Sequence, residues 1–177
     1  KSTHPILTSP PSTDPTNLLT IKVGQAPMTQ THTIPASFLT ARSEFFQRCL
    51  NGNWPTSSTK VITLPHEDPE TFATYISIAR TNCLTTKGIN TTFNTIETLI
   101  EAYTIAMDKL ISLYTLSTFL LDPATKNIAV LQMLLWARKC ANNDASTIQH
   151  PSYQHIRKLY EGTHRGCLAR TLFVDIW

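Results

Sequence analysis

Four residues that could bind a metal ion stand close together at His66, Glu67, Asp68 and Glu70. Imidazole and carboxylate groups are ordinary ligands for transition metals. Side chains at consecutive positions of a helix start point in different directions, so they do not converge on one ion. Helix capping also explains Asp68 and Glu70, because a carboxylate stabilises the first turn of a helix. We therefore predict a helix start here and no metal site.

Cys49 is the residue that could act as a nucleophile, if a histidine lay beside it. It shares the apolar face of a predicted helix with Phe45 and Phe46, and burial among apolar groups raises the pKa of a thiol and makes it unreactive. We interpret Cys49 as a core residue. The sequence also has no G-x-S-x-G, no H-E-x-x-H and no phosphate-binding glycine loop, and it contains only five Gly. It therefore predicts no catalytic residue and no cofactor.

Trp54 is the aromatic residue with two open interpretations, and Pro55 and Thr56 follow it. The first interpretation is packing at the edge of a helical segment. The second is a partly exposed anchor for a protein partner, because Trp is enriched in binding hot spots. We predict Trp54, Pro55 and Thr56 as candidate partner-binding residues.

The composition is typical of one folded domain. The chain has 177 residues, of which 41% are hydrophobic and 15% are charged, whereas disordered chains are less apolar and more charged. Four cysteines stand far apart without a C-x-x-C pair, which favours reduced thiols in an intracellular protein of the nucleus or cytoplasm. No apolar run is long enough to span a membrane. A chain that begins at Lys1 and ends at Trp177 is expected to be a fragment.

The net charge of +3 comes entirely from the C-terminal part of the chain. Residues 1–121 contain eight basic and eight acidic residues, whereas residues 122–177 contain seven basic and four acidic ones. The basic residues are dispersed, while nucleic-acid-binding proteins usually concentrate them on one face. Nucleic acid is therefore the less favoured partner. An interaction domain of a chromatin or transcription factor, with this half near nucleic acid, remains the alternative.

The order of predicted elements is strands first and helices afterwards. Residues 1–17 are rich in Pro, Ser and Thr and predict a disordered arm. Runs of β-branched residues predict strands at 18–23, 28–34 and 60–64, the first two as a hairpin. Capping residues and apolar periodicity predict helices. The predicted helices cover 43–51, 68–80, 96–110, 113–120, 127–140, 153–160 and 166–176.

Three segments together resemble the BTB/POZ family, in its fungal form. FLTARSEFFQRCLNGNW at 38–54 resembles the family's helix pair, and KVITLPHEDPETFATYI at 60–76 resembles the strand and helix that follow. EAYTIAMDKL at 101–110 matches a later family helix, and the segment at 156–177 resembles the helices that follow fungal BTB domains. The resemblance implies an α+β fold, mostly helical, with a small three-stranded sheet near the N-terminus. It also implies a BTB/POZ-like domain at 18–121 and a C-terminal helical extension at 122–177.

The resemblance implies a non-catalytic protein–protein interaction module that binds protein partners. Family members form homodimers through the first strand, which here contains Leu18, Leu19 and Ile21. Some members bind a cullin as adaptors of a ubiquitin ligase through a hydrophobic-x-Glu motif, where this chain has Trp54-Pro55-Thr56 and lacks the Glu. Others bind corepressors through charged residues, whose positions are here occupied by Leu18, Pro35 and Ala36. We expect self-association or partner docking without membrane contact.

Overall fold

The computed structural model describes residues 17–51, 58–84, 93, 95–143 and 150–176. Within these ranges the chain is mostly helical, with one small sheet near the N-terminus. The predicted α+β class is therefore confirmed. Most of the predicted arm, residues 1–16, lies outside the described residues.

A three-stranded sheet opens the domain. Its strands are β1 (Leu18–Val23), β2 (Gln30–Pro35) and β3 (Val61–Leu64), and their spatial order is β2-β1-β3. The predicted hairpin is confirmed, because β1 and β2 are antiparallel, while β1 and β3 are parallel. The second strand begins later than predicted, because the Met28 N–H donates to the Gln25 carbonyl at 2.8 Å and belongs to the turn.

Seven helices follow or interrupt the strands in the described part of the chain. They are α1 (Ala36–Thr40), α2 (Glu44–Leu50), α4 (Pro69–Thr81), α5 (Ile96–Phe119), α6 (Pro123–Asn143), α7 (Tyr153–Glu161) and α8 (Leu168–Ile176). The prediction of separate helices at 96–110 and 113–120 was wrong, because both belong to the continuous helix α5. No glycine or proline stands between Leu110 and Leu113 to end the helix, and the apolar spacing continues across that point.

Polar side chains begin four of these helices. Ser43, Asp68, Thr95 and Ser152 each accept a hydrogen bond from a backbone N–H in the first turn of the helix that follows. Such caps stabilise a helix by about 0.5–2 kcal/mol each. The predicted caps at Ser43 and Asp68 are confirmed.

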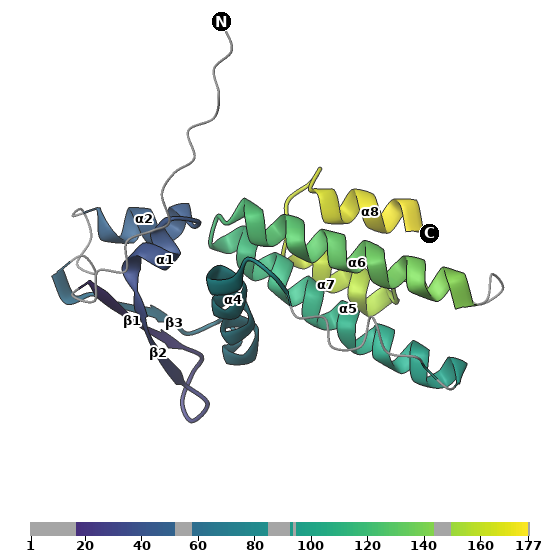
Figure 1. Cartoon of the computed structure of the whole chain (residues 1–177), viewed down its shortest axis with the longest axis horizontal. Helices are drawn as coiled ribbons and strands as arrows, with labels where there is room; N and C mark the ends of the chain where they lie inside the picture. Colours follow the sequence, from purple (N-terminus) through teal and green to yellow (C-terminus); the bar gives the residue numbers. More distant parts are fainter. Residues whose placement is uncertain (1–16, 52–57, 85–92, 94, 144–149, 177) are drawn as a thin grey trace, which may run out of the picture.

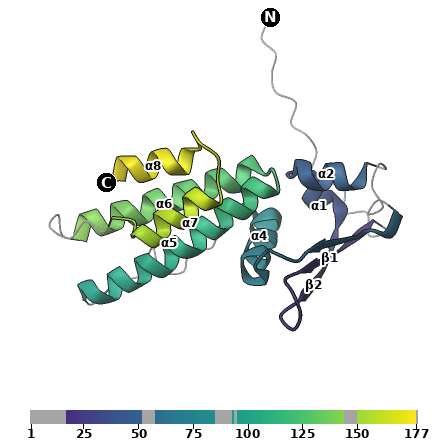
Figure 2. The ribbon, with the colours of Figure 1, turned by 180° about the vertical axis from the view of Figure 1, so that it is seen from behind.

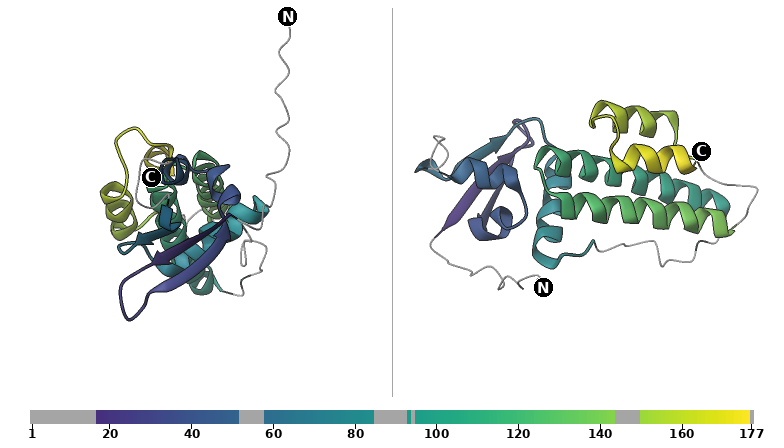
Figure 3. Two further views of the ribbon diagram at one scale, coloured as in Figure 1. Left: turned by 90° about the vertical axis from the view of Figure 1, so that its left-hand side faces the viewer. Right: turned by 90° about the horizontal axis from the view of Figure 1, so that it is seen from above.

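The elements form an elongated molecule with the sheet at one end (Figures 1 and 2). Helices α1 and α2 lie beside the sheet, α5 to α8 form a bundle at the other end, and α4 lies between the two parts. Helices α5 and α6 pack along each other, and α8 contacts both α6 and α7 (Figure 3). One continuous core links the sheet to the bundle. Its largest fully buried side chains include Phe46, Phe72, Tyr75, Tyr103 and Tyr114.

None of the helices in the described part of the chain combines the length and the apolar character needed to cross a lipid bilayer.

Candidate protein-interaction surfaces

The turn between α1 and α2 fixes how the sheet end joins the bundle. Ser43 is fully buried, and its Oγ accepts a hydrogen bond from the Phe46 N–H at 3.3 Å. The same hydroxyl donates to the Leu120 carbonyl at 2.5 Å, just beyond the end of α5. One side chain therefore begins α2 and also holds it against the C-terminal end of α5.

Arg42, beside Ser43, connects three further segments. Its Nε donates to Asp122 Oδ2 at 3.2 Å, its Nη1 to Asn82 Oδ1 at 2.9 Å, and its Nη2 to Thr125 Oγ1 at 3.0 Å. The Asp122 side chain is fully buried. Its Oδ1 accepts a hydrogen bond from the Thr125 N–H at 3.0 Å, in the first turn of α6. We name Arg42, Ser43, Asn82, Asp122 and Thr125 the Arg42 clamp. A buried charge pair with additional hydrogen bonds holds a defined geometry, because separating the partners would strand a charge.

A partly exposed apolar patch lies beside this clamp, with Leu121 next to Asp122 in the chain and Phe45 two residues after Ser43. The rings of Phe45 and Phe119 have centroids 5.1 Å apart and are tilted by 44°. Phe119 is 47% exposed and Leu121 is 40% exposed, and the Leu121 carbonyl accepts the Glu44 N–H at 3.4 Å. We name Phe45, Phe119 and Leu121 the Phe45 patch. Large apolar side chains gathered on one surface are typical of protein contact sites.

The backbone at Leu121 is held in a conformation that L-residues rarely adopt. Its φ is +54°, in the left-handed region, where contact between Cβ and the carbonyl oxygen costs about 1–2 kcal/mol. The next residue is Asp122 of the clamp, and Leu120 accepts the bond from Ser43. The clamp therefore fixes the residues on both sides of Leu121 and keeps this side chain at the surface.

A groove of about 670 Å³ lies between α4, α5, α6 and α7. Two ion pairs line it: Lys109 Nζ lies 2.7 Å from Glu70 Oε1, and Lys158 Nζ lies 2.6 Å from Asp108 Oδ1. Both pairs are exposed, so water screens them and each contributes little to stability. Apolar side chains, including Trp136, form the remaining walls. The charges of the groove largely neutralise each other.

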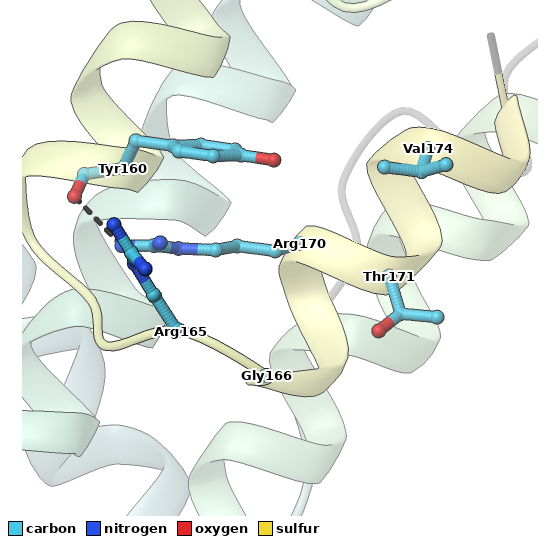
Figure 4. Close-up of a pocket in the computed structure, with 6 residues that line it drawn as sticks. All are labelled: Tyr160, Arg165, Gly166, Arg170, Thr171 and Val174. Atoms are coloured by element: carbon cyan, nitrogen blue, oxygen red, sulfur yellow. Dashed lines mark hydrogen bonds between the residues drawn. The ribbon is translucent and has the colours of Figure 1, made fainter.

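An open cleft of about 640 Å³ lies between α7 and α8 (Figure 4). Arg165 and Arg170 line it together with Tyr160, Thr171 and Val174. The guanidinium carbon of Arg170 lies 4.2 Å from the centroid of the Tyr160 ring. The cleft thus combines two guanidinium groups with exposed aromatic and aliphatic surface.

Burial raises the pKa of three tyrosines in the core. Burial raises the pKa of Tyr75, and the negative charge of Asp122 raises it further. Burial also raises the pKa of Tyr103, and it raises the pKa of Tyr114 to about 12. These phenols stay protonated at neutral pH, so none of the three acts as a base there.

The cluster from His66 to Glu70 contains a helix cap. Asp68 Oδ2 accepts the Thr71 N–H at 2.7 Å and the Thr71 hydroxyl at 2.7 Å, and these hydrogen bonds lower the pKa of Asp68. Burial raises the pKa of Glu67, while Glu70 pairs with Lys109. Across the described ranges, no three His, Cys, Asp or Glu side chains come together in a group that could hold a metal ion.

Cys49 is partly buried and packs against the core, and this burial raises the pKa of its thiol. A higher pKa leaves less thiolate at neutral pH, which agrees with the interpretation of Cys49 as a packing residue. None of the four cysteines forms a disulfide in the structure.

The three residues predicted for a dimer contact differ in exposure. Leu19 and Ile21 are fully buried in the core, whereas Leu18 is 44% exposed. Trp54, Pro55 and Thr56 lie outside the described residues. The Phe45 patch and the Arg165–Arg170 pair were not predicted. The sequence did indicate that Phe119 is exposed, because this residue falls outside the apolar stripe of Leu113, Leu116 and Leu120.

No protein-family model matches the chain, and no curated protein matches it in sequence. The resemblance to the BTB/POZ family therefore stays a prediction, carried by the residues of the sequence itself.

Proposed function

We propose that this chain is a non-catalytic protein–protein interaction module, which acts by self-association or by docking a protein partner. The observation that carries the proposal is the Phe45 patch beside the Arg42 clamp. Phe119 and Leu121 are exposed, Phe119 packs against the partly buried Phe45, and a buried ion pair lies next to them in the chain. Binding costs less when the binding surface is already ordered, because few side chains lose freedom on association.

The order of elements supports a BTB/POZ-like assignment within this proposal. A hairpin, a helix pair, a strand and an amphipathic helix follow one another in the described part of the chain, as the resemblance implies. The Arg-Ser step of the resembling segment is Arg42-Ser43, and both residues belong to the clamp. On this proposal, these two residues support the scaffold, and the exposed side chains around them select the partner.

Self-association is tested by light scattering over a range of protein concentrations up to high micromolar. We expect a dimer that Phe119→Lys weakens, because a charge at the centre of an apolar contact must lose its water. Tyr153→Lys is the matched control, since Tyr153 is 75% exposed on α7 and lies outside the patch. A chain that is monomeric at every concentration would exclude self-association.

Partner docking needs a separate measurement. Binding of a purified cullin N-terminal domain, measured by calorimetry, tests the adaptor version, which also places Trp54, Pro55 and Thr56 at the contact. We expect Trp54→Ala and Phe119→Lys to weaken this binding and Tyr153→Lys to leave it unchanged. If the chain is monomeric and also binds no cullin domain, self-association and the cullin-adaptor version are both wrong.

A further inference from the structure

The cleft between α7 and α8 contains an arginine that is held in place by neutral groups alone. Arg170 Nε donates to Thr163 Oγ1 at 2.9 Å, and its Nη2 donates to the Tyr160 carbonyl at 2.8 Å and to the Thr163 carbonyl. Its planar face stacks on the Tyr160 ring. These contacts fix the guanidinium group, and its Nη1 has no acceptor among the described residues.

The positive charge of Arg170 has no counter-charge beside it in the described part of the chain. The nearest acidic residue along α7, Glu161, accepts a hydrogen bond from Arg157 Nε at 2.7 Å. Arg170 itself is half-buried, and a partly desolvated cation without an anionic partner is unfavourable. An anion placed against Nη1 would relieve this cost.

Arg165 adds a second guanidinium to the same cleft. Gly166, which follows it, has a φ of +78°, a left-handed conformation that glycine adopts without cost. Arg165 and Arg170 both line the cleft, and their guanidinium groups extend toward the same end, beside Tyr160 (Figure 4). Arg165 is exposed and makes no hydrogen bond or ion pair with the other described residues. Its donors are available to a ligand.

Two guanidinium groups that line one cleft fit an anion with more than one charge and several acceptor oxygens. Arg clusters bind phosphate in this way, because each guanidinium offers parallel N–H donors to phosphate oxygens. The cleft is open along α8 and continues to Val174, which is 66% exposed, while Tyr160 is 45% exposed. An open surface with apolar side chains suits an extended peptide better than an enclosed small molecule.

We propose that the α7–α8 cleft binds a phosphorylated side chain on an extended segment of a protein partner, with Arg165 and Arg170 contacting the phosphate. The flanking residues of that segment lie on Tyr160 and Val174. This inference rests on the proposed function as a protein-interaction module and names one class of partner for a surface distinct from the Phe45 patch.

A nucleic-acid backbone is less well matched to this surface. Binding a backbone requires a row of cations that follows successive phosphates. Other cations of this half of the chain are engaged elsewhere: Lys158 pairs with Asp108, Arg157 pairs with Glu161, and Lys126 lies 5.6 Å from the centroid of the Tyr114 ring. The pair in the cleft can contact one phosphate but does not continue as a row.

The test is an NMR titration of the whole nitrogen-15-labelled chain with inorganic phosphate, followed at the Gly166 amide. Chloride at equal ionic strength is the control for general screening. We expect a saturable shift with phosphate, of roughly millimolar affinity, because a single phosphate makes few contacts. Arg165→Gln should weaken binding roughly tenfold through loss of charge-assisted hydrogen bonds. Arg80→Gln, a change at an exposed arginine on α4, should leave it unchanged.

A second arm compares a degenerate pool of phosphoserine peptides with the same pool carrying serine or glutamate, and with a short DNA duplex. We expect the phosphoserine pool to bind more tightly than inorganic phosphate and than the other probes. No saturable shift, or an affinity that is unchanged in Arg165→Gln, would overturn the site. Tighter binding of duplex DNA, or equal binding of the glutamate pool, would overturn the assignment to a phosphorylated protein segment.

Failure of the two proposals can be told apart. If phosphate and phosphopeptides do not bind while Phe119→Lys still disrupts association, only the inference about the cleft is wrong. If the cleft binds phosphopeptides while the chain neither associates nor binds a cullin domain, the Phe45 patch has been assigned the wrong role.

Discussion

Replacing Asp122 tests whether the Arg42 clamp holds the sheet end against the bundle. The Asp122 side chain is fully buried and accepts hydrogen bonds from Arg42 Nε, the Thr125 N–H and the Thr125 hydroxyl. Asp122→Ala removes all three bonds and leaves Arg42, whose side chain is 13% exposed, without its anionic partner. Asp122→Asn keeps one acceptor oxygen for the Thr125 N–H, removes the charge, and replaces the oxygen that faces Arg42 Nε with an NH2 donor.

The expected loss of unfolding free energy is large for the alanine variant. Removing one partner of a buried ion pair costs about 3–5 kcal/mol, because the remaining charge stays desolvated. Hydrogen bonds to charged groups contribute about 1.5–3 kcal/mol and those to neutral groups about 0.5–1.5 kcal/mol. Asp122→Asn also leaves Arg42 without an anion, so it should cost less than Asp122→Ala only by the retained bond to the Thr125 N–H, about 0.5–1.5 kcal/mol. Since whole domains are stable by about 5–15 kcal/mol, both effects are measurable.

The assay is urea unfolding followed by circular dichroism, with the wild-type chain and each variant measured at one concentration. The control is Glu44→Ala, which removes an exposed pair with Arg48 and should cost only a few tenths of a kcal/mol. The double variant of Arg42→Ala and Asp122→Ala should lose less than the sum of the single losses. A loss below about 1 kcal/mol for Asp122→Ala, or strict additivity, would refute the role given to the clamp.

Three further changes test other parts of the structure. Burial lowers the pKa of His155 below its ordinary value of 6.5. The unfolded chain therefore binds the proton more readily than the folded chain does. The free energy of unfolding should fall as the pH drops below about 6.5. His155→Gln should flatten that pH dependence in urea titrations, and an unchanged slope would contradict this. A Cβ at Gly162 would clash with Thr115 Cγ2, so Gly162→Ala should cost about 1–3 kcal/mol of unfolding free energy. Adding Thr115→Ala should restore part of this loss in the same assay. Cys83 is exposed and Cys140 is buried with a raised pKa, so a thiol reagent should modify Cys83 first in the native chain, whereas equal rates would be inconsistent with this packing.

Local signals predicted the elements well where a few neighbouring residues decide the outcome. Ser43 and Asp68 cap helices as expected, because a cap depends on an oxygen and a backbone N–H three residues apart. The hairpin of β1 and β2 formed in the same way, since the two strands are close in sequence. The break predicted between Leu110 and Leu113 was wrong, because apolar spacing alone does not end a helix when no terminating residue is present.

The candidate surfaces could not be predicted in the same way. Arg42 and Asp122 are 80 residues apart, and nothing in either local segment indicates that they pair. The Phe45 patch joins residues of α2 with residues at and beyond the end of α5. Leu19 and Ile21, which the resemblance assigned to a dimer contact, are fully buried.

The sequence by itself determined the helix caps at Ser43 and Asp68, which residues are apolar enough to fill the core, and the α+β class. These properties follow from side-chain chemistry within a few residues, so they can be derived without knowing the fold. Only the tertiary structure decided that Arg42 reaches Asp122, that Phe119 is exposed beside Phe45, and that Arg165 and Arg170 share a cleft. Contacts between distant segments depend on how helices pack, and packing is settled by the whole core at once.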